Sequence, residues 1–341
     1  MKKILVVLTG GTICSSVNPV GKRYSDANNV KIINHFKNGN SNFCNAEFDS
    51  FISTDILSEN MTASSWNKIL SDFKKINFDL YCGIIVLHGT DTLAYTSSLF
   101  SLLLAGCKIP VCMVSSQLPL EYKNTNGHDN FRASVELIMN GINPNVYVVY
   151  KNIDGEIYVH YGCHLLQCAN YSNDFFSRDM KKLTNFHNCF FEGKTFETNS
   201  CLINKIDKIS CDVLSIVPYV GINYSVYNLD SISAVLHGTY HSETVCAEQK
   251  NNSYEQTDSS VISLIDKCKK TDIDFFLSPC SPDSYNYEST GHVLEHGAKC
   301  INNVTFETAY AKLVIGCSMG LKGDELYRFV QKSINYEASS L

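Results

Sequence analysis

Short apolar runs that alternate with helix-like stretches are the feature that most limits what this chain can fold into. In the first half of the sequence, four such runs are typical of buried strands, at residues 3–8, 83–87, 110–114 and 146–150. Between them, apolar residues recur every three or four positions, as they do on one face of a helix. Strands that are separated by helices pair in parallel, because each helix carries the chain back before the next strand begins. The pattern predicts an α/β fold with a doubly wound, mainly parallel sheet.

A polar segment divides the sequence into two parts. Residues 179–210 are irregular and rich in lysine and asparagine, and beyond them strands and helices alternate again in a shorter series. We therefore expect a larger N-terminal domain over residues 1–190, a linker over residues 191–210 and a smaller α/β C-terminal domain over residues 211–341.

Charge and hydropathy favour a protein that binds small molecules. The formal net charge is -6 and there is no basic stripe, so we expect no nucleic acid as partner. A membrane span needs about 20 consecutive apolar residues. The best stretch, residues 99–114, is interrupted by Gly106, Lys108 and Pro110, so we expect no membrane either.

The cysteine and histidine residues indicate neither a disulfide framework nor a metal site. The chain has 15 cysteines, an odd number, scattered and without any Cys-x-x-Cys pair. This usage is typical of buried thiols in a reducing cytoplasm. His292 and His296 have helical spacing but lack the acidic partner of a metalloprotease motif, so we expect no metal.

Three polar motifs follow predicted strands directly, at residues 9–12 (Thr-Gly-Gly-Thr), 88–92 (His-Gly-Thr-Asp-Thr) and 115–117 (Ser-Ser-Gln). In an open α/β sheet, ligands bind beyond the carboxyl ends of the strands, so we expect the three to converge on one pocket. Glycines let the backbone approach a ligand, and hydroxyl groups next to them serve as nucleophiles or hydrogen-bond donors. Each motif alone is equally typical of a turn and a helix cap.

The ordered set of motifs resembles the L-asparaginase family, and it is closest to the cytoplasmic type I branch. Residues 9–13 and 88–92 carry the likeness, and residues 58–62, 117–120 and 304–313 extend it along the chain. The resemblance implies hydrolysis of L-asparagine or a related carboxamide to L-aspartate and ammonia, without a metal or organic cofactor. It also implies an asparaginase-like catalytic domain followed by an asparaginase-like C-terminal domain, and a cytoplasmic homodimer or homotetramer.

The same resemblance assigns catalytic roles to four residues. Thr12 becomes the first candidate nucleophile and Thr90 the second, grouped with Asp91. A threonine hydroxyl must be activated by a neighbouring base or charge. Tyr24, in the polar segment after Thr12, matches a tyrosine that positions the nucleophile. We expect Thr12, Thr90 and Asp91 to line one pocket.

Substrate binding is assigned to three further residues. Ser58 and Glu59 would hold the α-carboxylate and α-amino groups of the substrate, and Asp91 would also contact the amino group. Gln117 belongs to the segment that matches the family's serine-glutamine-proline sequence.

The most important departure from the family pattern concerns a lysine. The family carries a lysine after the hairpin, and counting back from Phe176 in this sequence gives Gln167. No lysine lies between Lys151 and Lys181. A glutamine amide neither carries a charge nor accepts the proton of a threonine. Either the alignment slips across the hairpin, so that a more distant lysine reaches the site, or the chemistry or the substrate has changed.

Three functions remain open from the sequence. The first is an amidohydrolase of asparaginase type, and the second is a divergent, non-catalytic amino-acid-binding module that lost the lysine. The third is a glutaminase-like subunit of a tRNA-dependent amidotransferase, which shares the motifs. That subunit typically has an extra amino-terminal domain, and because the first predicted strand begins at Lys3 we expect no such domain here.

Overall fold

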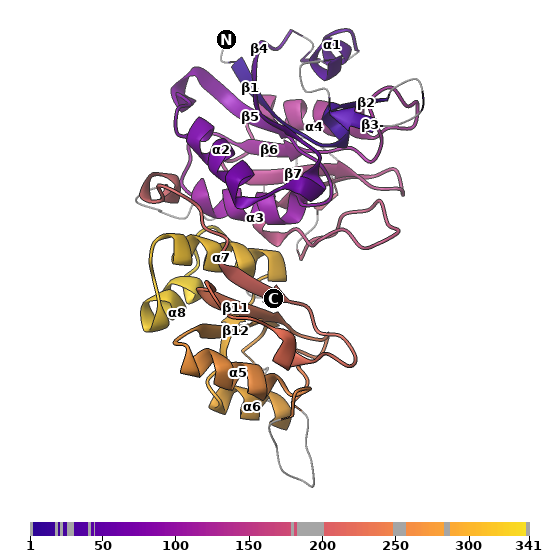
Figure 1. Ribbon diagram of the computed structural model, residues 1–341. Helices are drawn as coiled ribbons and strands as arrows, with labels where there is room; N and C mark the ends of the chain where they lie inside the picture. Colours follow the sequence, from indigo (N-terminus) through magenta and orange to yellow (C-terminus); the bar gives the residue numbers. More distant parts are fainter. Residues whose placement is uncertain are drawn as a thin grey trace. The chain divides into compact units, whose positions relative to one another are not determined.

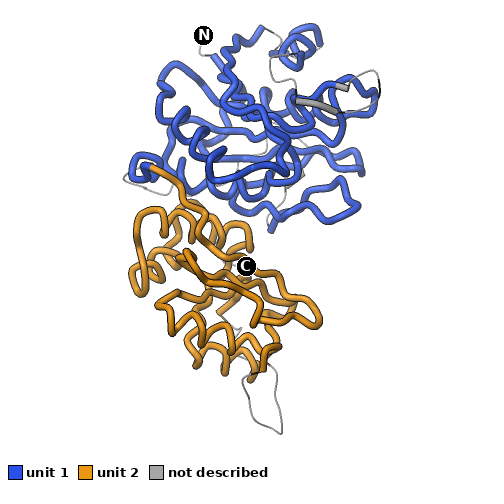
Figure 2. The backbone as a smooth tube through the Cα atoms, viewed as in Figure 1, with its two compact units in different colours: residues 1–207 blue, residues 208–341 orange. Residues whose placement is uncertain are grey.

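The computed structural model describes residues 3–17, 20, 23–25, 31–39, 42–43, 45–178, 181–182, 201–247, 257–282 and 287–338. The chain divides into two compact units, residues 1–207 and residues 208–341 (Figure 2). Residues 191–200 of the predicted linker lie outside the described residues. Leu202–Lys205 forms a short 3-10 helix (η5) that belongs to the first unit.

A seven-stranded sheet, counted over the described residues, forms the centre of the first unit (Figure 1). Its strand order is β4-β1-β5-β6-β7-β8-β9. The pairs from β4 to β7 are parallel, and β8 and β9 are added antiparallel. The strands are β1 (Lys3–Gly10), β4 (Phe48–Ile56), β5 (Tyr81–Leu87), β6 (Val111–Val114), β7 (Val146–Lys151), β8 (Ile157–Tyr161) and β9 (Lys181–Lys182); β2 (Ser15–Val17) and β3 (Arg23–Ser25) pair separately.

Helices cover both faces of this sheet. Ile85 and Leu87 of β5 share a core with Phe131 of α4, whereas Val86 between them faces Phe73 of α2. A strand that is buried on both faces needs apolar residues at every position, which explains the continuous apolar runs in the sequence. The helices are α1 (Lys31–Lys37) and α4 (Gly127–Met139) on one face, α2 (Ala63–Phe73) and α3 (Leu93–Leu103) on the other, with short 3-10 helices η1 (Thr12–Cys14), η2 (Ser58–Asn60), η3 (Phe78–Leu80) and η4 (Gly162–His164).

The second unit is a smaller α/β structure around a four-stranded parallel sheet with the order β10-β11-β12-β13. Helices α5 and α6 pack on one face, while α7 and α8 lie on the other (Figure 1). The predicted α/β class, with a larger and a smaller sheet, is confirmed. The elements are η6 (Tyr224–Val226), β10 (Val213–Ile216), β11 (Ala234–Gly238), α5 (Val261–Lys270), β12 (Asp274–Cys280), α6 (Glu288–Glu295), β13 (Lys299–Asn302), α7 (Phe306–Ser318) and α8 (Gly323–Gln331).

Candidate functional site

The strand order of the first unit changes direction between β1 and β5. From β1 the chain continues to β4 on one side, and from β5 it continues to β6 on the other. Connections that leave two neighbouring strands in opposite directions open a crevice at the carboxyl edge of the sheet. Thr12 follows β1 and Thr90 follows β5, so both motifs start at this crevice.

Glycines allow the loops at the crevice to touch through their backbones. Gly10 and Gly11 have φ angles of 103° and 80°, a region that only glycine adopts easily. A Cβ on Gly11 would lie 2.2 Å from the Cα of Gly89, and a Cβ on Gly89 would lie 2.4 Å from Ser58 Oγ. The loops after β1 and β5 and the η2 segment therefore meet at distances that exclude any larger side chain.

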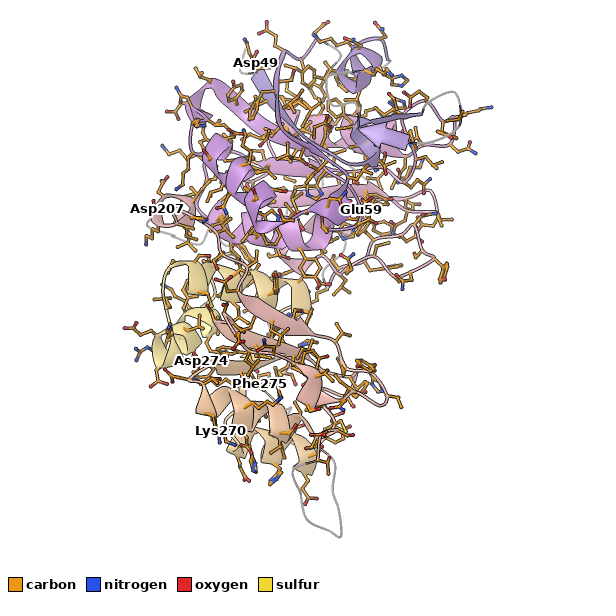
Figure 3. All side chains as sticks on the ribbon, viewed as in Figure 1. Asp49, Glu59, Asp207, Lys270, Asp274 and Phe275 are labelled. Carbon is orange, nitrogen blue, oxygen red and sulfur yellow. The ribbon has the colours of Figure 1, made fainter. Side chains whose placement is uncertain are left out.

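Ser58 holds the loop after β5 in place. Its hydroxyl donates to Asp91 Oδ2 at 3.0 Å and accepts a hydrogen bond from the Asp91 backbone N–H at 3.1 Å. The hydroxyl of Thr92 donates to the Ser58 carbonyl at 3.0 Å. Ser58 is buried, whereas its neighbour Glu59, which is labelled in Figure 3, is exposed. Ser58 is thus a fixed partner of the Asp91 carboxylate.

A cavity of about 280 Å³ adjoins this network. Thr90, Asp91, Gln117 and Gln167 line it, and residues 168–173 form much of its wall together with the rings of Tyr150 and Phe175. Among the described residues, its lining contains no lysine or arginine. The structure therefore gathers Thr90, Asp91 and Gln117 around one cavity, while Thr12, Ser58 and Glu59 are not among the residues that line it.

Gln167 lies against the loop after β5. Its side-chain Nε2 donates to the backbone carbonyl of Asp91 at 2.5 Å. Of the two lysines that could substitute for a lysine at this position, Lys151 pairs with Asp129 at 2.8 Å, and the side chain of Lys181 lies outside the described part of the structure. The group in contact with the Asp91 loop is thus a neutral amide.

Two asparagines fix the ends of β6 and β7 beside the cavity. Asn126 Oδ1 accepts from the backbone N–H of Gln117 at 3.0 Å, and its Nδ2 donates to the Lys151 carbonyl at 2.9 Å. Asn130 has the opposite arrangement: its Nδ2 donates to the Ser115 carbonyl at 2.9 Å, and its Oδ1 accepts from the Lys151 N–H at 2.7 Å. No pattern in the sequence indicates that these asparagines hold Gln117 in position.

The ionisable groups buried at the site are neutral at ordinary pH. His88 is fully buried, its Nδ1 donates to the Gly89 carbonyl at 2.7 Å, and burial lowers the pKa of His88 to about 4. Burial also raises the pKa of Tyr150 to about 12. Neither residue can supply the positive charge that a lysine would bring.

The remaining predicted site residue is Tyr24. Its backbone belongs to β3 and pairs with Ser16 of β2, but its side chain lies outside the described residues. Over the described ranges, no group of three or more His, Cys, Asp or Glu is placed to hold a metal ion, and no helix is long and apolar enough to cross a membrane.

Comparison with known proteins gives one family match and several relatives. The family described as "Asparaginase, N-terminal" matches residues 3–194. Over 151 residues the chain is 31% identical to L-asparaginase of Thermococcus kodakarensis, a match that covers 44% of each chain. Over 136 residues it is 32% identical to L-asparaginase 1 of Escherichia coli K12, covering 38% of each. Over 134 residues it is 33% identical to one of the subunits of glutamyl-tRNA(Gln) amidotransferase from Saccharolobus solfataricus, covering 39% of this chain and 30% of that protein.

These sequence matches span less than half the length of the curated relatives. The solved structure of the thermostable L-asparaginase from Thermococcus kodakarensis is similar over almost the whole chain. Its TM-score is 0.79 at 20% identity, with 99% of this chain and 100% of that chain covered. At this identity the likeness shows the fold.

Proposed function

Because the chain belongs to the asparaginase family, we propose that its substrate is L-asparagine or a related carboxamide, which it hydrolyses to the acid and ammonia. The family membership confirms the resemblance that the motifs indicated. The observation that carries the proposal is the contact between Gly11 and Gly89. It brings Thr12 and Thr90, the residues next to these glycines, to the same crevice.

The proposed reaction begins with attack of a threonine hydroxyl on the carboxamide carbon. Thr12 is the first candidate for this nucleophile and Thr90 the second, with Tyr24 positioning Thr12. The amide nitrogen leaves as ammonia, and water then releases the acid from the acyl intermediate. Ser58, Glu59 and Gln117 would hold the substrate. Asp91 would bind the ammonium group of the substrate, while the hydrogen bond from Ser58 holds the Asp91 carboxylate in place.

Gln167 sets the expected rate. The attack needs a group that accepts the threonine proton, and such general-base assistance contributes about 10²- to 10⁴-fold. The amide of Gln167 cannot accept this proton, although it occupies the place beside the Asp91 loop. We therefore expect turnover in the natural protein to be slower, by roughly this factor, than in a chain with a lysine at this position.

A second candidate function has one observation in its favour. Over the described residues, the cavity is lined mostly by polar side chains and by no lysine or arginine, and this is compatible with binding an amino acid without turnover. In that case the chain would be an amino-acid-binding module with the shape of an amidohydrolase.

The assembly into a homodimer or homotetramer, and a place in the cytoplasm, likewise stay proposals.

The test is ammonia release from L-asparagine and L-glutamine by the full chain and four variants. Gln167→Lys should raise the rate by about 10²-fold or more, while Leu166→Lys adds the same charge at the adjacent exposed residue and should not. Thr12→Ala should abolish the rate, and Lys151→Ala should leave it unchanged because Lys151 is paired with Asp129. A high natural rate that collapses only in Lys151→Ala would show that Gln167 is misplaced.

Calorimetry separates the two candidate functions. If the natural protein and Gln167→Lys both fail to release ammonia but bind asparagine or aspartate, the binding module is the better description. If neither binds nor turns over any carboxamide tested, both proposals are wrong.

A further inference from the structure

The Ser58 segment and the Asp91 carboxylate offer a ligand hydrogen-bond acceptors rather than donors. A serine hydroxyl has one proton, and the proton of Ser58 goes to Asp91 Oδ2 at 3.0 Å. Toward a substrate, the Ser58 hydroxyl can therefore only accept. The next residue, Glu59, is a second acidic side chain and is exposed to solvent. Acceptors and negative charges favour an ammonium group, which has three donors and a positive charge.

A free amino acid brings a carboxylate together with its ammonium group, because both are attached to the α-carbon. An ammonium group bound to Asp91 therefore places the ligand's own carboxylate close to the Asp91 carboxylate, and like charges at short range repel. Within the described ranges of the chain, no lysine or arginine lines the adjoining cavity to balance that charge. A ligand whose α-carboxyl group is part of an amide avoids the repulsion, since an amide is neutral.

The cavity beside Asp91 has room and partners for a peptide unit. Its volume of about 280 Å³ is close to the lower end of the range for pockets that hold drug-sized molecules, about 300 to 1,000 Å³, and so exceeds the need of a single amino acid. Asn170 and Asn173 line it with exposed side chains, and neither side-chain amide has a hydrogen-bond partner in the part of the chain that the structure describes. A side-chain amide both donates and accepts, as a peptide unit does, so the two groups match.

We propose that the substrate is the carboxamide of an asparagine at the amino terminus of a short peptide. This inference rests on the proposed function, because it names the substrate of the same site. The free α-ammonium group binds Asp91, and the peptide unit that follows the asparagine lies in the cavity against Asn170 and Asn173. Over the whole reaction, the bond between the side-chain carboxamide carbon and its nitrogen breaks, and the oxygen of a water bonds to that carbon. The nitrogen takes one proton of the water and leaves as ammonia, while the peptide bond stays intact.

Two isomeric dipeptides test the proposal against free L-asparagine. L-asparaginyl-L-alanine carries a free ammonium group and no carboxylate on the α-carbon of its asparagine, whereas L-alanyl-L-asparagine carries the carboxylate and no ammonium group there. The full chain is titrated with each of the three ligands by calorimetry, and ammonia release from each is measured for the natural protein and for Gln167→Lys. We expect asparaginyl-alanine to bind about 10-fold or more tightly than either of the other two. Mass spectrometry should identify its product as aspartyl-alanine.

A double variant, Asn170→Ala/Asn173→Ala, tests the cavity wall. Both side chains are exposed, so their removal should not change folding. The preference for asparaginyl-alanine over asparagine should fall by about 10-fold, the factor that two neutral hydrogen bonds contribute. Asn140→Ala is the matched control and should keep the natural preference, because Asn140 is an exposed asparagine at the end of α4 that does not line the cavity.

Two results would overturn this proposal. They are asparagine bound as tightly as asparaginyl-alanine or more tightly, and a double variant with the same preference as the Asn140→Ala control. If asparagine also releases ammonia in the first case, the proposed function stands and only the peptide substrate is wrong. Failure of the proposed function has a different signature, in which asparaginyl-alanine is bound with the expected preference but neither the natural protein nor Gln167→Lys releases ammonia from any of the three ligands. If no ligand binds, both are wrong.

Discussion

The ion pair between Lys312 and Glu337 allows a quantitative test of how the end of the chain is held. Lys312 Nζ, on α7, donates to a Glu337 carboxylate oxygen and, at 2.7 Å, to the backbone carbonyl of Lys332. Glu337 also accepts from the backbone N–H groups of Ile334 and Asn335, at 2.8 and 2.6 Å. Both charged side chains are fully buried. Each of the two buried charges is therefore balanced by the other.

The perturbation is Lys312→Met, which keeps an unbranched side chain of similar length and removes the ammonium group. It leaves the Glu337 carboxylate buried with two backbone donors only. Breaking a buried pair by removing one partner costs about 3 to 5 kcal/mol of unfolding free energy. In a domain of ordinary size each kcal/mol corresponds to a few degrees in Tm, so we expect a fall of roughly 10 °C or more.

The assay is thermal and urea denaturation of the full chain, followed by circular dichroism. Lys3→Met is the matched control, because Lys3 pairs with Asp49 at the surface, where the side chains are 44% and 43% exposed. An exposed pair of this kind contributes about 0 to 1 kcal/mol. The double variant Lys312→Met/Glu337→Leu removes both buried charges and should recover much of the loss.

Two outcomes would refute this reasoning. One is a loss of stability in Lys312→Met no larger than that in Lys3→Met. The other is a double variant less stable than either single variant, since the two charges would then not depend on each other.

Two further predictions concern the site and its pH dependence. Gly11→Ala should destabilise the protein far more than Gly141→Ala. The two glycines have nearly the same φ, 80° and 79°, but of the two only Gly11 has a neighbour, Gly89, within reach of a Cβ. Equal urea midpoints for the two variants would contradict the close approach. Burial lowers the pKa of His88 to about 4. Between about pH 6.5 and 4 the unfolded chain therefore binds a proton at this histidine that the folded chain does not. Because of this difference, the free energy of unfolding falls as the pH falls. His88→Asn should reduce this fall by up to about 3 kcal/mol, and an unchanged pH profile would show that His88 is not the group responsible.

The parts of the fold that sequence could predict are those whose burial leaves a simple pattern. β1, β5 and β6 are covered on both faces, so each is a short, continuous apolar run. β4 was not predicted because it is an edge strand in which polar residues such as Ser50 and Asp55 are exposed and interrupt any continuous apolar run. β13 was not predicted because its four residues begin and end with half-buried polar side chains and so form no apolar run.

For the candidate site, the sequence indicated which strand ends lie together but not the contacts made there. The motifs after β1 and β5 indicated which strand ends to compare, because parallel strands finish at one edge. The hydrogen bonds of Ser58 with Asp91 join residues 33 apart in the sequence, and no local pattern records them. The cavity wall at residues 168–173 lies in a loop whose sequence has no regular spacing, so only the folded chain assigns it to the site.

A glutamine in place of a lysine at position 167 affects the chemistry of the site more than its shape. Its amide donates a hydrogen bond to the Asp91 carbonyl, and the ammonium of a lysine could make the same contact, since both groups carry N–H donors. The loop after β5 therefore keeps its support whichever of the two residues is present. What differs is a titratable amine beside Asp91: the backbone hydrogen bond does not require one, but a neutral amine can accept the proton of a threonine whereas an amide cannot. Under the function we propose, a chain can thus keep the crevice, the glycine contact and the hydrogen bonds of Ser58 while the side chain at position 167 sets the rate of the chemistry.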